Sequence, residues 1–257
     1  MRVEGLACRA RCEPAMHDNP PSPHPRRKLY GRRRGPRLSA HQDDLLETLL
    51  PTLSLAPVAG RDPRSYFPSP AEGEAVSDVW LEVGFGAGEH LLWQAAQHPR
   101  IGLIGAEPYL SGVAKLLSKL AASPDREPRS AGGRNLRLYT DDARNILDAL
   151  PDASLGRVFL LFPDPWPKTR HHKRRFVQME LLDVLARVMR PGTEFRFASD
   201  DADYANWTLE RFLAHPDFRW TAACAADWRS RSPDWPKTRY EAKALHGVPV
   251  FLRFRRL

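Results

Sequence analysis

From residue 79 to the end, the sequence alternates short apolar runs with amphipathic segments, an order that few folds accept. The apolar runs predict strands buried on both faces, and the amphipathic segments predict helices. Alternating strands and helices favour an α/β class with a mostly parallel sheet and helices on both faces. The expected strands are 79–83, 101–106, 136–140, 157–162, 194–199, 218–222 and 248–254, and the expected helices are 89–97, 110–121, 143–150, 176–189 and 203–214. The last two strands can pair antiparallel.

The fourth expected strand leads into the segment FPDPWPKTRHHKRR. Its three prolines end the strand and hold the chain in a stiff turn. Asp164 and Trp166 are therefore displayed at the strand end, where open α/β sheets bind ligands. Five Lys or Arg residues and two His follow within residues 168–175. This order suits a site for a flat, hydrogen-bonding group carried on a polyanion; the alternative is a rigid turn before a solvated basic face.

A glycine-rich turn follows the first expected strand. Gly84, Gly86 and Gly88 stand at alternate positions, so the backbone can turn sharply and approach a ligand closely. The alternative is a turn that serves only strand-to-helix packing. Two acids strengthen the ligand hypothesis: Glu82 lies near the end of the first strand, and Glu107 follows the second, where a carboxylate can accept both hydroxyls of a ribose.

Further acids follow two later strands. Asp141 and Asp142 come after the third, where a carboxylate can meet an adenine amino group; we expect Asp142 to make that contact, while Asp141 can equally cap the next helix. Asp200 comes after the fifth strand, and helix capping is the alternative to a site role for it as well.

The positive charge of the chain is concentrated at its N-terminus. Lys and Arg outnumber Asp and Glu by 39 to 31, and residues 1–40 alone hold ten basic against three acidic residues. We expect residues 1–39 to be a mostly disordered basic arm that suits a phosphate-bearing partner. Residues 40–75 are expected to form one amphipathic helix over 40–53 and a Pro/Gly-rich linker, and residues 76–257 to form the α/β domain.

Several classes of protein do not fit the sequence. Three cysteines, Cys8, Cys12 and Cys224, do not make a disulfide framework in a chain of 257 residues. Cys8 and Cys12 with His17 and His24 match no strong zinc spacing, so we expect no metal. No apolar run is long enough for a membrane span, and no secretory signal is visible. We expect a cytoplasmic protein with no membrane partner.

The motifs together resemble one family. A strand, a GxGxG turn and a helix, with an acid after the next strand, resemble the class I S-adenosylmethionine-dependent methyltransferases. Within that class, residues 79–257 are similar to the tRNA (guanine-N7)-methyltransferases. The resemblance rests on LEVGFGAGEHL, IGAEPYLSGV, DDARNIL, FPDPWPKTRHHKRR, FASDDADYA and TRYE, of which the fourth is the most specific. It implies a Rossmann-like fold with a seven-stranded sheet, and transfer of a methyl group from S-adenosyl-L-methionine to a tRNA guanine, usually numbered 46.

The resemblance also implies roles for individual residues. For the cofactor these are Glu82, Gly84, Gly86, Gly88, Glu107, Asp142 and Asp164, and Asp164 is also the expected catalytic residue. For the tRNA they are Lys168, Asp200, Thr238, Arg239, Tyr240 and Glu241, to which the basic run adds Arg170, Lys173, Arg174 and Arg175 as phosphate contacts. We expect no obligate protein partner, and a monomer. The pentapeptide WPKTR occurs at 166–170 and 235–239, either because both copies face one substrate or by accident.

The chemistry of guanine N7 limits what the site must do. N7 carries an in-plane lone pair and no proton at neutral pH, so alignment and desolvation matter more than a strong base. We therefore expect Asp164 to position guanine by accepting its N–H donors, and a general-base role is the alternative. Trp166 can stack on a base or be a buried structural residue. Two other hypotheses stay open: a methyltransferase for another nucleic-acid amine, and a non-catalytic RNA-binding subunit with this fold.

Overall fold

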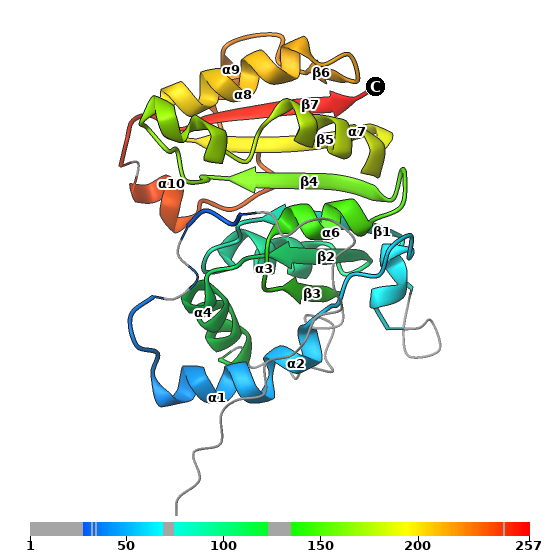
Figure 1. Cartoon of the computed structure of the whole chain (residues 1–257), viewed down its shortest axis with the longest axis vertical. Helices are drawn as coiled ribbons and strands as arrows, with labels where there is room; N and C mark the ends of the chain where they lie inside the picture. Colours follow the sequence, from blue (N-terminus) through cyan, green and yellow to red (C-terminus); the bar gives the residue numbers. More distant parts are fainter. Residues whose placement is uncertain (1–27, 32, 34, 69–74, 123–134, 244) are drawn as a thin grey trace, which may run out of the picture.

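The computed structural model describes residues 28–257, except 32, 34, 69–74, 123–134 and 244. One seven-stranded sheet runs in the order β3-β2-β1-β4-β5-β7-β6. Its strands are β1 (Asp78–Val83), β2 (Ile101–Ala106), β3 (Leu136–Tyr139), β4 (Leu155–Leu161), β5 (Met189–Ser199), β6 (Phe218–Trp220) and β7 (Val250–Arg256). The first five are parallel, whereas β7 is antiparallel to both β5 and β6. The mostly parallel Rossmann-like sheet predicted from the sequence is confirmed, including the antiparallel end (Figure 1).

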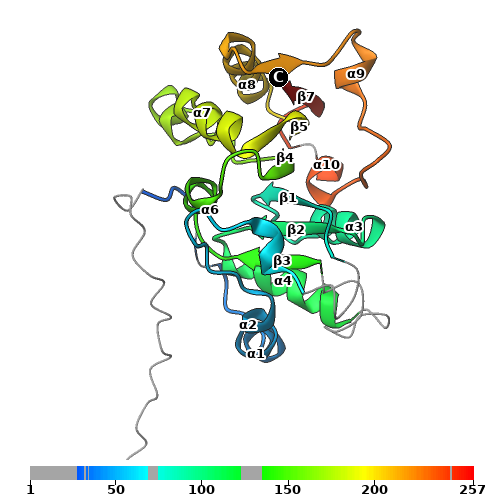
Figure 2. The same ribbon diagram turned by 90° about the vertical axis from the view of Figure 1, so that its right-hand side faces the viewer.

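Helices cover both faces of this sheet. They are α3 (Glu89–Gln97), α4 (Leu110–Ala121), α6 (Ala143–Ala149), α7 (Met179–Val188) and α8 (Ala202–Ala214). Figure 2 shows α6 and α7 on one face and α3 on the other. Successive strand residues point to opposite faces, so Leu81 joins the core beneath α6, α7 and α8 while Trp80 joins the core beneath α3 and α4. Each face of the sheet therefore has its own apolar core.

The N-terminal part of the described chain departs from expectation in two places. The single helix expected over 40–53 is two helices, α1 (Ala40–Thr48) and α2 (Leu50–Leu53). Pro51 lies in the first turn of α2, because its ring cannot continue α1 but fits a helix start. The expected linker also contributes to the core, since Leu55 and Phe67 are buried on either side of η1 (Pro63–Tyr66), a 3₁₀ turn.

The connection between β6 and β7 is not a plain loop. It contains two short helices, α9 (Ala226–Arg229) and α10 (Arg239–Lys243), and α10 includes most of the TRYE segment. Both helices are too short for the amphipathic periodicity that reveals a helix in sequence. Among the residues that the structure describes, no helix is long and apolar enough to cross a membrane.

Candidate active site at the ends of the parallel strands

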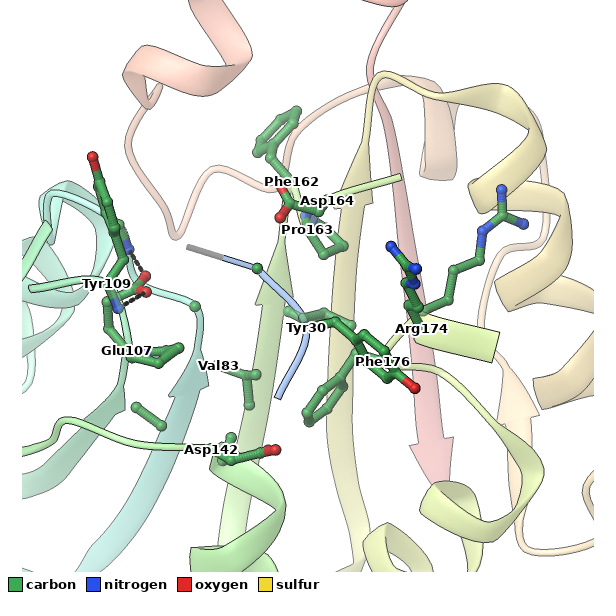
Figure 3. Close-up of a pocket in the computed structure, with 18 of the residues that line it drawn as sticks. Tyr30, Val83, Glu107, Tyr109, Asp142, Phe162, Pro163, Asp164, Arg174 and Phe176 are labelled. Atoms are coloured by element: carbon green, nitrogen blue, oxygen red, sulfur yellow. Dashed lines mark hydrogen bonds between the residues drawn. The ribbon is translucent and has the colours of Figure 1, made fainter. Parts of the chain in front are cut away.

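A cavity of about 550 Å³ opens where β1, β2 and β4 end (Figure 3). We call it the strand-end pocket. Its lining includes Gly84, Gly86, Glu107, Asp142, Asp164, Trp166, Arg174, Arg175 and Tyr240, together with Tyr30 from the N-terminal segment. Ligands bind at this place in open α/β sheets, and the volume suits a small organic molecule. The structure therefore brings together residues that lie more than 200 positions apart.

The glycine-rich turn forms one wall of the pocket. Gly84, Gly86 and Gly88 all have left-handed backbones, with φ of 71°, 55° and 72°. Gly84 and Gly86 line the pocket, whereas a Cβ on Gly88 would lie 2.3 Å from the Leu116 side chain of α4. The three glycines therefore divide the two roles considered for the turn: the first two permit close approach to a ligand, and the third permits packing of α3 on α4.

Glu107 follows β2 and reaches the pocket with its carboxylate held in place. The backbone N–H groups of Gly86 and Tyr109 donate to its two oxygens, at 2.8 Å and 2.9 Å (Figure 3). Burial raises the pKa of Glu107, and these two hydrogen bonds oppose the shift. The side chain is thus a fixed acceptor pair with lone pairs left for hydroxyl donors.

Glu82 differs from its expected position at the pocket. Its carboxylate is buried and lies 2.7 Å from Nδ1 of His90, a residue of α3. It does not belong to the lining of the strand-end pocket, whereas the next residue, Val83, does. Because side chains alternate along a strand, Glu82 points beneath the glycine-rich turn rather than into the pocket.

Of the two aspartates after β3, Asp142 makes the helix cap that was considered for Asp141. Asp142, not Asp141, caps α6, since its side chain accepts from the backbone N–H of Arg144 at 3.0 Å and from its guanidinium. Asp142 also lines the pocket, so its expected contact with an adenine stays a prediction. Asp141 instead pairs with Arg33.

Asp164 lies on the opposite side of the pocket from Glu107 (Figure 3). It is exposed, and the turn that carries it is flanked by two non-glycine residues with left-handed backbones, Phe162 (φ 50°) and Trp166 (φ 49°). Such residues are uncommon, cost about 1–3 kcal/mol each and cluster at functional sites. The turn is secured from below, where Arg175 Nε donates to the carbonyl of Pro165 at 2.9 Å.

The basic run after Asp164 does not form one solvated face. Lys168, Arg170 and Lys173 are exposed, as phosphate contacts require. Arg174 lies at the pocket beside two rings, with its guanidinium carbon 4.9 Å from the centre of Trp166 and 5.1 Å from that of Tyr30. Arg175 differs from the expectation of a phosphate contact, because its buried guanidinium pairs with Asp203 and lies against Tyr204. It supports the turn instead.

The remaining expected substrate residues lie in the segment 238–241 and directly after β5. Tyr240 lines the pocket, and Thr238 Oγ1 accepts from the N–H of Glu241 at 3.3 Å. Arg239 is exposed. Asp200 does not cap α8, because Asp201 does so by accepting from the N–H of Tyr204. Asp200 instead accepts from the N–H of His246 at 3.0 Å and so holds the far end of the segment that carries α10.

The two WPKTR copies lie in different surroundings. Trp166 lines the strand-end pocket, whereas Trp235 is buried in the core between His90 and Phe251. The tryptophans therefore do not have equivalent places at one substrate. The structure favours different roles for the two copies.

One pocket residue, Tyr30, was missed in the sequence because the basic arm was expected to be disordered up to residue 39. Its ring lies 6.4 Å from that of Trp166. The segment is anchored on both sides, since Arg33 pairs with Asp141 and the Lys28 carbonyl accepts from Arg144 at 3.2 Å. The apolar Leu29–Tyr30 pair within a basic stretch was the only available signal. Residues 1–27, including Cys8 and Cys12, lie outside the described residues.

The residues present fit S-adenosylmethionine. Gly84 has open space beside it, so a ligand can approach the protein backbone there. Glu107 offers acceptors to a pair of ribose hydroxyls. Within the described residues, no group of three or more His, Cys, Asp or Glu side chains is arranged to hold a metal.

Comparison with known proteins places the chain. A methyltransferase family model matches residues 77–250, which is more than half of it. The tRNA (guanine-N(7)-)-methyltransferase of Rhodospirillum rubrum is 49% identical over 92% of this chain and 91% of its own. The enzymes of the same name from Ruegeria pomeroyi and Brucella abortus are 48% and 49% identical, over 91% and 87% of this chain and 96% and 92% of theirs. The 16S rRNA methyltransferase KamB has a solved structure that covers 78% of this chain and 98% of its own, at 18% identity and a TM-score of 0.47. The chain belongs to the tRNA (guanine-N(7)-)-methyltransferase family.

Proposed function

We propose that this protein transfers a methyl group from S-adenosyl-L-methionine to N7 of a guanine in tRNA, giving 7-methylguanosine. The observation that carries the proposal is a single cavity with Glu107 on one side and Asp164 on the other, in a chain of this family. The cofactor supplies an electrophilic methyl group, and guanine N7 supplies a lone pair, so the protein must mainly align the two and exclude water.

Cofactor binding is assigned to the wall formed by the ends of β1, β2 and β3. Gly84 and Gly86 allow close approach, Glu107 accepts the ribose hydroxyls, and Asp142 lies where an adenine amino group would be met. Gly88 and Glu82 act beneath this wall, by packing on Leu116 and by pairing with His90.

Asp164 is assigned to guanine. A carboxylate presents two acceptors to the adjacent N–H donors of the guanine edge, and its exposed position lets the base enter from solvent. No proton has to leave N7 before attack, so Asp164 positions the base and need not act as a general base. Asp164 also faces the space given to the cofactor, which fits a role at the junction of the two ligands.

The tRNA backbone is assigned to exposed basic residues that are near pocket residues in the sequence. Lys168, Arg170 and Lys173 follow the turn that carries Asp164, and Arg239 precedes Tyr240 of the pocket lining. Arg174 is held at the rim by Trp166 and Tyr30, where it can reach the phosphate next to a bound guanosine. We further propose the variable-loop guanine usually numbered 46 as the target, a monomer as the active form, and the cytoplasm as the location.

The test is mass spectrometry of nucleosides from tRNA incubated with the protein and methyl-labelled cofactor. Label in 7-methylguanosine is expected. Label in another nucleoside would indicate a different nucleic-acid amine as substrate. A protein that binds tRNA but shows no cofactor binding by calorimetry would be a non-catalytic subunit.

The variant Asp164→Asn tests the positioning role. Asn offers one acceptor and one clashing donor, a loss of about 1–3 kcal/mol, so the single-turnover rate should fall roughly ten- to a hundredfold. Asp152→Asn is the control, because Asp152 is exposed and pairs only with Arg187 on the surface among the described contacts. An unchanged rate in Asp164→Asn would remove Asp164 from the mechanism.

A further inference from the structure

Helix α10 contributes no buried residue, although it lies at the mouth of the strand-end pocket and carries Tyr240. Core packing therefore cannot fix its position. A five-residue helix is also too short to be stable by itself. Specific polar contacts must hold it, and they determine how precisely Tyr240 is placed at the pocket.

Arg231 supplies one such contact, donating to Glu241 at 3.2 Å, and another comes from Glu89, the first residue of α3. One carboxylate oxygen of Glu89 accepts from the backbone N–H of Arg239 at 2.7 Å. Arg239 is the first residue of α10, where N–H groups have no acceptor within their own helix. Lys119 donates to the other oxygen at 3.1 Å and to the Ala87 carbonyl at 2.9 Å. Glu89 thus caps α10 from another element and is itself held beside the glycine-rich turn.

A second contact strengthens the same connection. Gln94 of α3 donates to the carbonyl of Asp234 at 3.0 Å, upstream of α10. Gln94 also lies 3.1 Å from His90, whose other ring nitrogen meets Glu82. Helix α3 therefore holds the segment at two points, and it begins directly after Gly88. The Tyr240 ring completes the contact, because it lies 3.0 Å from where a Cβ on Gly86 would be.

We propose that Glu89 is a positioning residue for methyl transfer: it fixes the start of α10, so that the substrate residues of this helix are held at a set place over the cofactor turn. Glu89 does not line the strand-end pocket, so it acts through Arg239 and Tyr240. This inference deepens the proposed function and uses tRNA methylation as one of its two measurements.

The charge of Glu89 supports this role. Burial opposes its ionisation, but the hydrogen bonds from Arg239 and Lys119 outweigh burial and lower the pKa of Glu89. The side chain is therefore an anion at neutral pH, and charge-assisted acceptors give the stronger hydrogen bonds to backbone N–H groups.

The first experiment measures single-turnover methylation with saturating cofactor and tRNA. Glu89→Ala should lower the rate roughly ten- to a hundredfold, because a small displacement of positioning groups has that effect. Cofactor affinity should change less than about threefold, because Glu89 does not line the strand-end pocket. Glu89→Gln keeps an acceptor for the Arg239 N–H and should restore most of the rate. Asp62→Ala is the matched control, since Asp62 also caps a short helical turn but does not line the pocket.

The second experiment isolates the N–H group. Arg239→Ala removes only the side chain, whereas Arg239→Pro also removes the N–H, at a first helical position that tolerates proline. In the wild-type background Pro should be slower than Ala, and in the Glu89→Ala background the two should be equal. Equal rates in both backgrounds, or a loss in Glu89→Ala no larger than in Asp62→Ala, would overturn the proposal.

Amide hydrogen exchange without tRNA separates this proposal from the proposed function. Residues 239–243 should exchange at least tenfold faster in Glu89→Ala than in wild type, while the strands stay protected. If wild type methylates no tRNA but the exchange difference is present, the function is wrong and the positioning contact stands. An unchanged exchange rate would show that Glu89 does not hold α10, whatever the activity.

Discussion

Gly84 and Gly88 have the same backbone conformation in different surroundings, so alanine at each position should have a different consequence. Both have φ near 70°. A Cβ on Gly84 would meet nothing within 4 Å, but would occupy space at the strand-end pocket. A Cβ on Gly88 would come within 2.3 Å of Cδ1 and 2.7 Å of Cγ of Leu116. The comparison separates the cost of the backbone from the cost of the space.

The magnitudes follow from these contacts. A left-handed alanine costs about 1–2 kcal/mol, but alanine also lowers the conformational entropy of the unfolded chain, which offsets part of that cost. Gly84→Ala should therefore lose about 1 kcal/mol of unfolding free energy. Gly88→Ala pays the same amount and must also move Leu116, which adds about 1–3 kcal/mol of overpacking. Its total loss should be about 2–4 kcal/mol. The order should reverse for cofactor affinity, with a loss of about tenfold or more in Gly84→Ala and little change in Gly88→Ala.

Urea unfolding of the cofactor-free proteins and calorimetric titration of the cofactor measure the two effects separately. Equal stability losses would mean that α4 moves aside at no cost, and the packing role of Gly88 would be wrong. Normal cofactor affinity in Gly84→Ala would mean that the cofactor does not approach this part of the turn.

Two further predictions concern charged side chains. Burial raises the pKa of Glu107, so cofactor affinity should fall as pH decreases through that pKa. Calorimetry across pH should find that Glu107→Gln binds the cofactor more weakly, with an affinity that does not depend on pH. In the cofactor-free protein, the contribution of Glu107 to stability should decrease as pH rises through its pKa. Arg175→Met should lose about 2–3 kcal/mol of unfolding free energy in urea and leave the salt dependence of tRNA binding unchanged. Arg170→Met should instead reduce the slope of that salt dependence by about one. A reduced slope in Arg175→Met would mean that Arg175 is a phosphate contact after all.

The sequence predicted the fold well because its strands carry strong signals. The strands β1, β2 and β4 each contain a short apolar run, and antiparallel pairing of the last two strands was among the expectations. The errors lie where local signals compete. Pro51 breaks an otherwise continuous apolar stripe into α1 and α2, and α10 is held by contacts with a distant helix rather than by its own periodicity.

From the sequence, the site could be predicted only as the place where several parallel strands end. Parallel topology brings Glu107, Asp142 and Asp164 to one edge, and the structure places all three at one pocket. What each side chain does there depends on partners that the motif does not name. Asp142 is occupied by Arg144, and Glu82 turns under the sheet edge toward His90.

The different surroundings of Arg174 and Arg175 could not be predicted from the sequence. They are identical neighbours in one basic run, yet one guanidinium lies beside two aromatic rings at the pocket and the other is buried. The difference comes from α8, about thirty residues later, which supplies Asp203 and Tyr204 for Arg175. Removing an arginine from water requires a counter-ion and hydrogen-bond acceptors, and the structure provides Asp203 as the counter-ion and the Pro165 carbonyl as an acceptor. The exposed turn that carries Asp164 therefore rests on a buried arginine, whose guanidinium is already paired with Asp203.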